Sequence, residues 1–84
     1  MRLDKFLKVS RIIKRRTLAN EACDAGKVSV NGKPVKAGCQ LKIGDIVELR
    51  FAQRTVMVEV LSLEENAGKA EAAAMYREIK QEGK

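Results

Sequence analysis

The first sixteen residues of the chain gather seven basic side chains, and this pattern suits the binding of an anion. The seven stand against a single acid, Asp4. The segment carries a net charge of +6, the net charge of the whole 84-residue chain, because residues 17–54 carry +2 and residues 55–84 carry −2. Charge placed on one side of a protein attracts polyanions, such as nucleic acid or an anionic membrane. The candidate contact residues are Arg2, Lys5, Lys8, Arg11, Lys14, Arg15, Arg16 and Thr17.

Groups that support catalysis or metal binding are scarce in the sequence. The chain has no histidine, which removes the commonest general base and the commonest metal ligand. Cys23 and Cys39 are separated by fifteen residues without a CxxC motif, so a structural zinc site lacks ligands. No glycine-rich nucleotide loop is present. The sequence therefore predicts a binding protein that is not an enzyme and that has no metal or cofactor.

Nucleic acid suits the basic segment better than a membrane does. A helix lying on a membrane surface needs a broad apolar face with aromatic side chains, and the apolar residues here are few. Arginine grips phosphate with two parallel hydrogen bonds, whereas aromatics that could stack on bases make up only 4% of the chain. We therefore expect structured RNA recognised by its shape. The plain alternative is that the charges form an ordinary solvated face.

The elements that would position these charges begin with two helices. Over residues 2–9, Leu3, Phe6 and Leu7 recur on one side while basic residues occupy the other. A connector then leads to a second helix at about residues 18–25, for which Thr17 is a plausible cap and Gly26 a plausible end. The two helices would place the charges on one concave surface.

The rest of the chain predicts a small sheet and a third helix. Asn31-Gly32 indicates a hairpin turn, and strands are expected at about residues 46–51 and 55–60. A helix is expected over residues 69–82, with a stripe that packs on the core or docks a partner. The stripe consists of Ala72, Met75, Tyr76 and Ile79.

The predicted fold is α+β, with two antiparallel helices on a small bent antiparallel sheet and a C-terminal helix. Residues 1–64 would form the RNA-binding domain, and residues 65–84 a helix packed on or beside it.

Cellular location follows from what the sequence lacks. No apolar run approaches the ~20 residues of a membrane span, and the start has no apolar stretch typical of a secretory signal. Two cysteines in such a chain are expected to be reduced thiols. A cytoplasmic protein is expected.

Four stretches resemble the small RNA-binding domain named after ribosomal small-subunit protein four. They are RLDKFL at 2–7, SRIIKRRTLANE at 10–21, GKVSVNGK at 26–33 and KIGDIVEL at 42–49. The family pattern runs R-L-D, an arginine-rich turn, a helix after Arg-Ser or Arg-Thr, then V-x-V-N-G and G-D. The resemblance covers about residues 1–52. It implies an RNA surface on the first helix and the start of the second, with Asp4 bracing neighbouring basic side chains.

Short stand-alone members of this family act on the large ribosomal subunit. The resemblance to them implies that the chain contacts ribosomal RNA and tRNA on an obstructed subunit, stabilises P-site tRNA, and supports C-terminal alanine tailing by a partner of the RqcH type. Two alternatives stay open. One is a heat-shock-type protein that recycles stalled subunits carrying nascent chains, and the other is a protein-interaction module that uses the C-terminal helix. A monomer is expected, because the charged face would repel a second copy.

Overall fold

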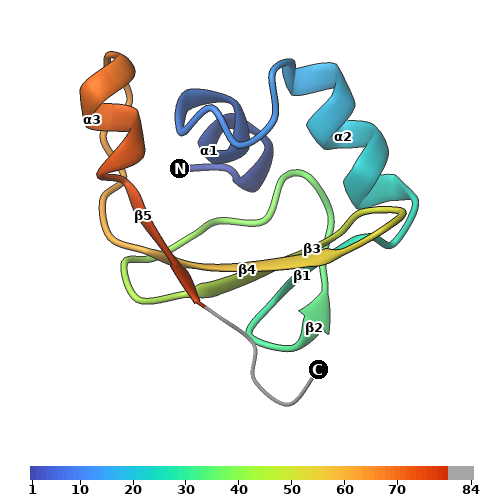
Figure 1. The fold of residues 1–84 in the computed structure, drawn as a ribbon. Helices are drawn as coiled ribbons and strands as arrows, with labels where there is room; N and C mark the ends of the chain where they lie inside the picture. Colours follow the sequence, from blue (N-terminus) through green and yellow to red (C-terminus); the bar gives the residue numbers. More distant parts are fainter. Residues whose placement is uncertain (80–84) are drawn as a thin grey trace.

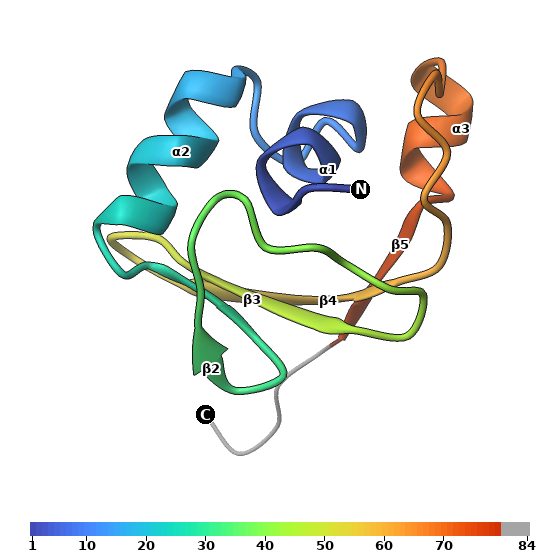
Figure 2. The ribbon, with the colours of Figure 1, turned by 180° about the vertical axis from the view of Figure 1, so that it is seen from behind.

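Residues 1–79 are described by the computed structural model, and they form the expected α+β fold (Figure 1). The strands make one antiparallel five-stranded sheet with the order β2-β1-β3-β4-β5. Figures 1 and 2 show the helices on the same side of this sheet, with α1 between α2 and α3. The elements in chain order are α1 (Leu3–Val9), α2 (Arg16–Asp24), β1 (Val28–Val30), β2 (Lys33–Pro34), β3 (Ile46–Arg50), β4 (Thr55–Val60), α3 (Lys69–Ala73) and β5 (Tyr76–Ile79).

The core lies between the helices and the sheet, where the alternating pattern of β4 places its valines. Val58 and Val60 are fully buried, as is Phe6 of α1. Burying one such side chain contributes about 1.5–3 kcal/mol. The apolar side of α1 therefore fixes this helix on the sheet and leaves its other side for the basic residues.

The start of α1 is tied to a distant segment, residues 37–41. The amides of Leu3 and Asp4 donate to the carbonyls of Cys39 at 2.8 Å and Ala37 at 3.1 Å. The first amides of a helix have no partner within the helix, so these bonds satisfy donors that would otherwise be buried and unpaired. They fix the position of the first helical turn, which holds Asp4.

The hairpin prediction at Asn31-Gly32 is confirmed. Both residues have positive φ, 52° and 86°, as a tight hairpin turn requires. The Asn31 side chain also accepts a hydrogen bond from the amide of Ile46 at 3.0 Å. This turn therefore connects β1 to β2 and is braced by the start of β3.

The cap predicted at Thr17 is wrong. The helix α2 begins at Arg16, its N-cap residue is Arg15, and no side chain caps it. Thr17 lies inside the first turn and is exposed. Gly26 does end this region with a positive φ of 75°, as predicted.

The C-terminal helix is present but much shorter than predicted. It ends at Ala73, and Tyr76–Ile79 form strand β5, which pairs with β4. Pairing of the β4 edge and a cross-strand ion pair between Arg77 and Glu59 outweigh the modest helix propensity of these residues. The predicted residues 80–82 lie outside the described part.

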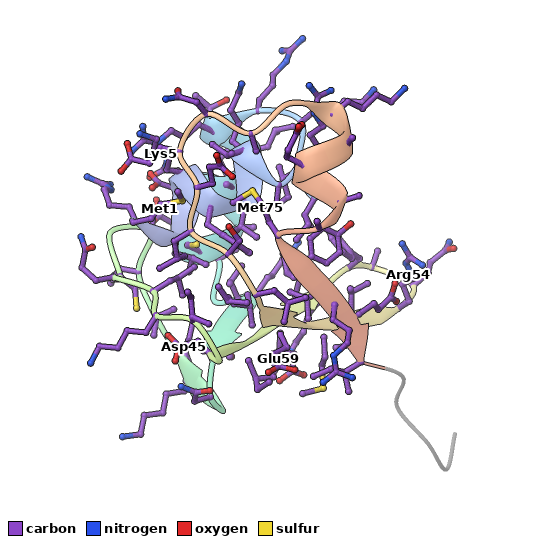
Figure 3. The ribbon with its side chains drawn as sticks, turned by 90° about the vertical axis from the view of Figure 1, so that its left-hand side faces the viewer. Met1, Lys5, Asp45, Arg54, Glu59 and Met75 are labelled. Atoms are coloured by element: carbon purple, nitrogen blue, oxygen red, sulfur yellow. The ribbon has the colours of Figure 1, made fainter. Side chains whose placement is uncertain are left out.

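Core packing of the C-terminal stripe is confirmed for its first half. Ala72 and Met75 are each 1% exposed, and Figure 3 shows Met75 inside the molecule. Tyr76 and Ile79 are half-buried. None of the helices in residues 1–79 has both the length and the apolar character that crossing a membrane requires.

Replacing Met75 tests whether the C-terminal segment belongs to the cooperative core. Met75→Ala is expected to lower the free energy of unfolding by about 2–5 kcal/mol, because it leaves a cavity beneath α3 and β5. Urea unfolding followed by circular dichroism measures this. The matched control is Met57→Ala, at a half-buried position of β4. Equal losses in the two variants would contradict the core role of Met75.

Candidate RNA-binding surface

A buried carboxylate, Asp4, organises the basic residues at the start of both helices. Its side chain is 2% exposed, and Arg2 and Arg16 each approach it with two nitrogens, at 3.1–3.3 Å. Asn20 Nδ2 donates to Asp4 Oδ2 at 2.9 Å, and the backbone amide of Lys5 donates to Oδ1 at 2.8 Å. The expected role of Asp4, bracing its basic neighbours, is confirmed.

The charge state of Asp4 follows from two opposing effects. Burial raises the pKa of its carboxyl, whereas the hydrogen bonds from Arg16, Asn20 and Arg2 lower it, and the pKa lies below its ordinary value. Asp4 is therefore ionised at neutral pH. A buried charge is tolerated only when it is paired and hydrogen-bonded, as this one is.

Both arginines that contact Asp4 remain available at the surface. The side chains of Arg2 and Arg16 are 49% and 45% exposed. A guanidinium has five N–H donors, and each uses only part of them on the carboxylate. Asp4 thus holds two guanidinium groups side by side, with donors left over for a second anion.

Three further predicted residues line a groove of about 660 Å³. Lys8, Arg11 and Lys14 form one wall, and the segment 65–67 contributes to the other. Arg11 has a positive φ of 65°, and its amide donates to the carbonyl of Lys8 at 3.0 Å. This left-handed residue ends α1 in a tight turn, which brings the three cations to one groove.

The remaining predicted residues behave differently from one another. Arg15 is exposed, and no ion pair to it, or to the three groove cations, is found within residues 1–79. Lys5 is half-buried, and its Nζ lies 3.0 Å from Glu65 Oε1. Thr17 is exposed in the first turn of α2. The structure therefore divides the predicted residues into an arginine pair on Asp4, three groove cations, Lys5 paired with Glu65, and two exposed residues, Arg15 and Thr17.

Two residues of this surface were not anticipated from the sequence. Asn20 follows Arg16 by one helical turn, and asparagine inside a helix is unfavourable unless its side chain has a partner, which is a weak signal of its role. Glu65 follows a strand end and resembles ordinary surface charge. Its contact with Lys5 spans 60 positions along the chain, and no local pattern indicates it.

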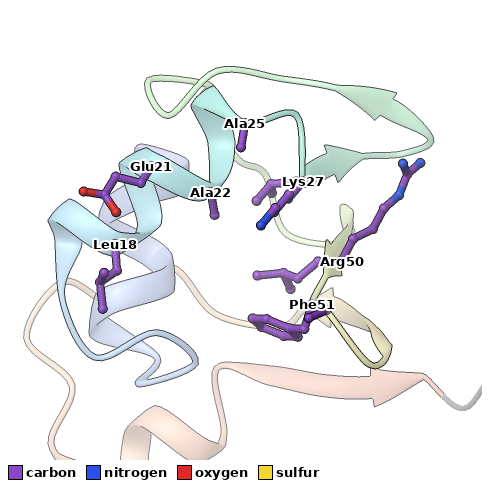
Figure 4. Close-up of a pocket in the computed structure, with 10 residues that line it drawn as sticks. Leu18, Glu21, Ala22, Ala25, Lys27, Arg50 and Phe51 are labelled. Atoms are coloured by element: carbon purple, nitrogen blue, oxygen red, sulfur yellow. The ribbon is translucent and has the colours of Figure 1, made fainter.

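A second, largely apolar groove of about 360 Å³ lies between α2 and the end of β3 (Figure 4). Leu18 and Phe51 line it and are 46% and 42% exposed. Lys27 and Arg50 also line it. None of the eight predicted contact residues lines this groove.

Removing the charge of Asp4 tests its role as the centre of the arginine pair. Asp4→Asn is expected to lower the free energy of unfolding by about 1–3 kcal/mol at neutral pH, because a charged acceptor for two arginines is lost. The folded pKa of Asp4 lies below the unfolded value of about 3.9. The stabilisation is therefore complete above that value and is lost as pH falls through the folded pKa.

The measurement is urea unfolding of both proteins between pH 7 and strongly acid solution. The difference between them should shrink only on the acid side. Asp24→Asn, which removes an exposed acid at the end of α2, is the control. A pH-independent difference would show that Asp4 acts through packing rather than charge.

Comparison with known proteins identifies the fold and the family. A sequence model of the family described as S4 domain matches residues 1–47. The solved trimeric structure of Vibrio cholerae Heat Shock Protein 15 superposes with a TM-score of 0.86 at 32% identity, covering 94% of this chain and 81% of the other. The solution structure of the hypothetical protein HP1423 gives 0.83 at 30% identity, covering 98% of this chain and all of the other.

Curated relatives match over nearly the full length. Proteins named RQC P-site tRNA stabilizing factor from Halalkalibacterium halodurans and Bacillus subtilis are both 54% identical over 82 residues, or 98% of this chain, and they are covered to 92% and 95%. Heat shock protein 15 of Escherichia coli is 36% identical over 80 residues, covering 93% of this chain and 59% of that protein. Because the family model matches residues 1–47, more than half of this chain, the chain belongs to the S4 domain family.

Proposed function

We propose that this chain is a non-enzymatic RNA-binding factor of ribosome quality control. Its RNA surface consists of the basic residues around Asp4 and along the first groove. In this proposal it contacts large-subunit ribosomal RNA and tRNA in the cytoplasm, and it acts as a monomer. The proposed contact residues are Arg2, Lys5, Lys8, Arg11, Lys14, Arg15, Arg16 and Thr17.

The observation that carries the proposal is the arginine pair on Asp4. Two guanidinium groups would repel each other, and the fold spends a buried carboxylate to hold them together at the surface. Arg16 is also the first residue of α2, whose N-cap residue is Arg15, and no side chain caps this helix. Positive charge at a helix start is unfavourable for the helix, whereas unpaired amides together with arginines suit a phosphate. The arrangement therefore favours the binding of an anionic partner at the expense of the stability of the free protein.

The relatives' names narrow the RNA to a ribosomal setting. Two proteins with 54% identity are named as factors that stabilise P-site tRNA in RQC. We propose that this chain likewise binds an obstructed large subunit carrying peptidyl-tRNA and holds that tRNA in the P site. It would thereby keep the subunit ready for C-terminal alanine tailing by an RqcH-type factor.

The two alternatives receive less support. A heat-shock-type recycling factor agrees with the fold, but the identity to the Escherichia coli protein is 36% and the chain spans 59% of its length. Docking of a partner on the C-terminal stripe would require Met75, which is 1% exposed and packs in the core.

Charge reversal in the connector and the start of α2 tests RNA binding. The double variant Lys14→Glu with Arg15→Glu changes two exposed cations that have no ion pair within residues 1–79, so the fold should persist. Each phosphate contact contributes about 0.7–0.9 to the slope of log affinity against log salt. Binding to the large subunit should therefore weaken strongly, with a slope shallower by about 1.5.

The measurement is co-sedimentation with separated small and large subunits over a salt series, with and without peptidyl-tRNA. Lys33→Glu reverses an exposed charge on β2, the edge strand of the sheet that lies away from the helices in Figure 1. It should bind like the wild type. Wild-type binding that ignores salt, or equal binding by the double variant, would contradict the proposal. Arg16→Glu is unsuitable, because it would place a carboxylate against Asp4.

Alanine tailing separates the quality-control role from the heat-shock-type role. A translation extract lacking this chain, supplied with an RqcH-type factor and stalled subunits, should add longer alanine tails when wild-type protein is restored. The double variant should leave the tails short, because the tRNA is not held. Tail length is read by gel mobility of the nascent chain. Unchanged tails on restoring the wild type would favour the recycling alternative.

A further inference from the structure

The first groove has a second wall that lies outside the S4 domain match. Its first wall, with Lys8, Arg11 and Lys14, belongs to residues 1–47, which match the family model. Its second wall is the segment 65–67, which follows β4 and precedes α3. The later part of the chain therefore shapes a surface whose charges come from the start.

The second wall brings an acid to this basic groove. Glu65 lines the groove, and its Oε1 lies 3.0 Å from Nζ of Lys5. The hydrogen bond and the charge of Lys5 lower the pKa of Glu65. Lys5 precedes Lys8 by one turn of α1, so the two side chains are neighbours on one face of the helix. The carboxylate of Glu65 is thus paired with the ammonium of Lys5, next to the cations that line the groove.

This carboxylate occupies a position that suits an RNA phosphate. Both groups are anions that accept hydrogen bonds from an ammonium. The Glu65 side chain is 61% exposed, so its ion pair with Lys5 is solvated, and a phosphate held by neighbouring cations can displace it. Asn66, which lines the groove and is exposed, adds an amide that can donate to the RNA backbone.

We propose that the groove between the end of α1 and the segment 65–67 is a phosphate-backbone site, and that Glu65 competes with RNA phosphate for Lys5. This inference rests on the proposed RNA binding, and it explains how the surface would distinguish between RNAs. An RNA that places phosphates on Lys8, Arg11 and Lys14 together displaces Glu65, whereas an RNA that touches one cation leaves the pair closed. Glu65 therefore weakens the binding of an RNA that contacts one cation more than the binding of an RNA that contacts all three groove cations.

The experiment measures the affinity of fluorescein-labelled purified tRNA by anisotropy between about 50 and 200 mM salt. Glu65→Gln keeps the shape and removes the charge. It is expected to raise affinity about 3- to 10-fold at low salt and to steepen the salt slope by about 0.7–0.9, because Lys5 then meets phosphate without a competitor. Glu64→Gln removes the same charge one position away, from an exposed side chain outside the groove lining.

A double-mutant cycle with Lys5→Gln isolates the competition from general charge. The gain from Glu65→Gln should disappear when Lys5 is already glutamine. Equal gains from Glu64→Gln and Glu65→Gln, or a gain that persists without Lys5, would overturn the competition by Glu65 while leaving RNA binding intact. If the wild type binds neither tRNA nor large subunits at low salt, the proposed function itself fails.

Discussion

The basic surface depends on the ionised carboxylate of Asp4 and on its burial against the two helices. One carboxylate receives paired contacts from Arg2 and Arg16 and a further bond from Asn20, so α1 and the first turns of α2 share one electrostatic centre. Burying the charge of Asp4 costs much free energy unless every partner is present, because an unpaired buried charge is strongly unfavourable. The tie between the helix start and residues 37–41 keeps Asp4 in place. The contacts that fix the start of α1 therefore also fix the arrangement of the basic surface.

The molecule tolerates an uneven charge because the fold separates packing from charge. The apolar side of α1 is fully buried on the sheet, whereas Lys8 and Arg11 stay exposed. Like charges this close raise the free energy of the folded state, and the start of α2 adds an unfavourable interaction with the helix dipole. Natural proteins keep such locally unfavourable features where a partner relieves them. The strain here is electrostatic, and phosphate would remove it.

Local patterns in the sequence predicted the parts of the fold that local physics decides. Alternating valines in β4, the Asn31-Gly32 turn and the apolar side of α1 all formed as expected, because burial and turn geometry act over a few residues. Residues 76–79, predicted as part of a helix, form a strand. They pair with β4, and the helix propensity of individual residues takes no account of such a long-range contact. The seven basic candidates could be named from their clustering in the sequence. Their division into an arginine pair and a groove could not, because it depends on Asp4 reaching across 16 positions to Asn20 and on Glu65 reaching back to Lys5.

In the proposed competition between Glu65 and RNA phosphate, the acidic later half of the chain has a physical role. A surface whose cations are all unpaired binds any RNA more tightly, because the free energy from counterion release does not depend on the sequence of the RNA. Selectivity requires a cost that only the correct partner repays. A solvated carboxylate beside a groove of three cations imposes such a cost, since a phosphate must be held by several neighbours before it can displace Glu65 from Lys5. In the proposed competition, the segment after β4 would therefore favour an RNA backbone that reaches several of these cations at once.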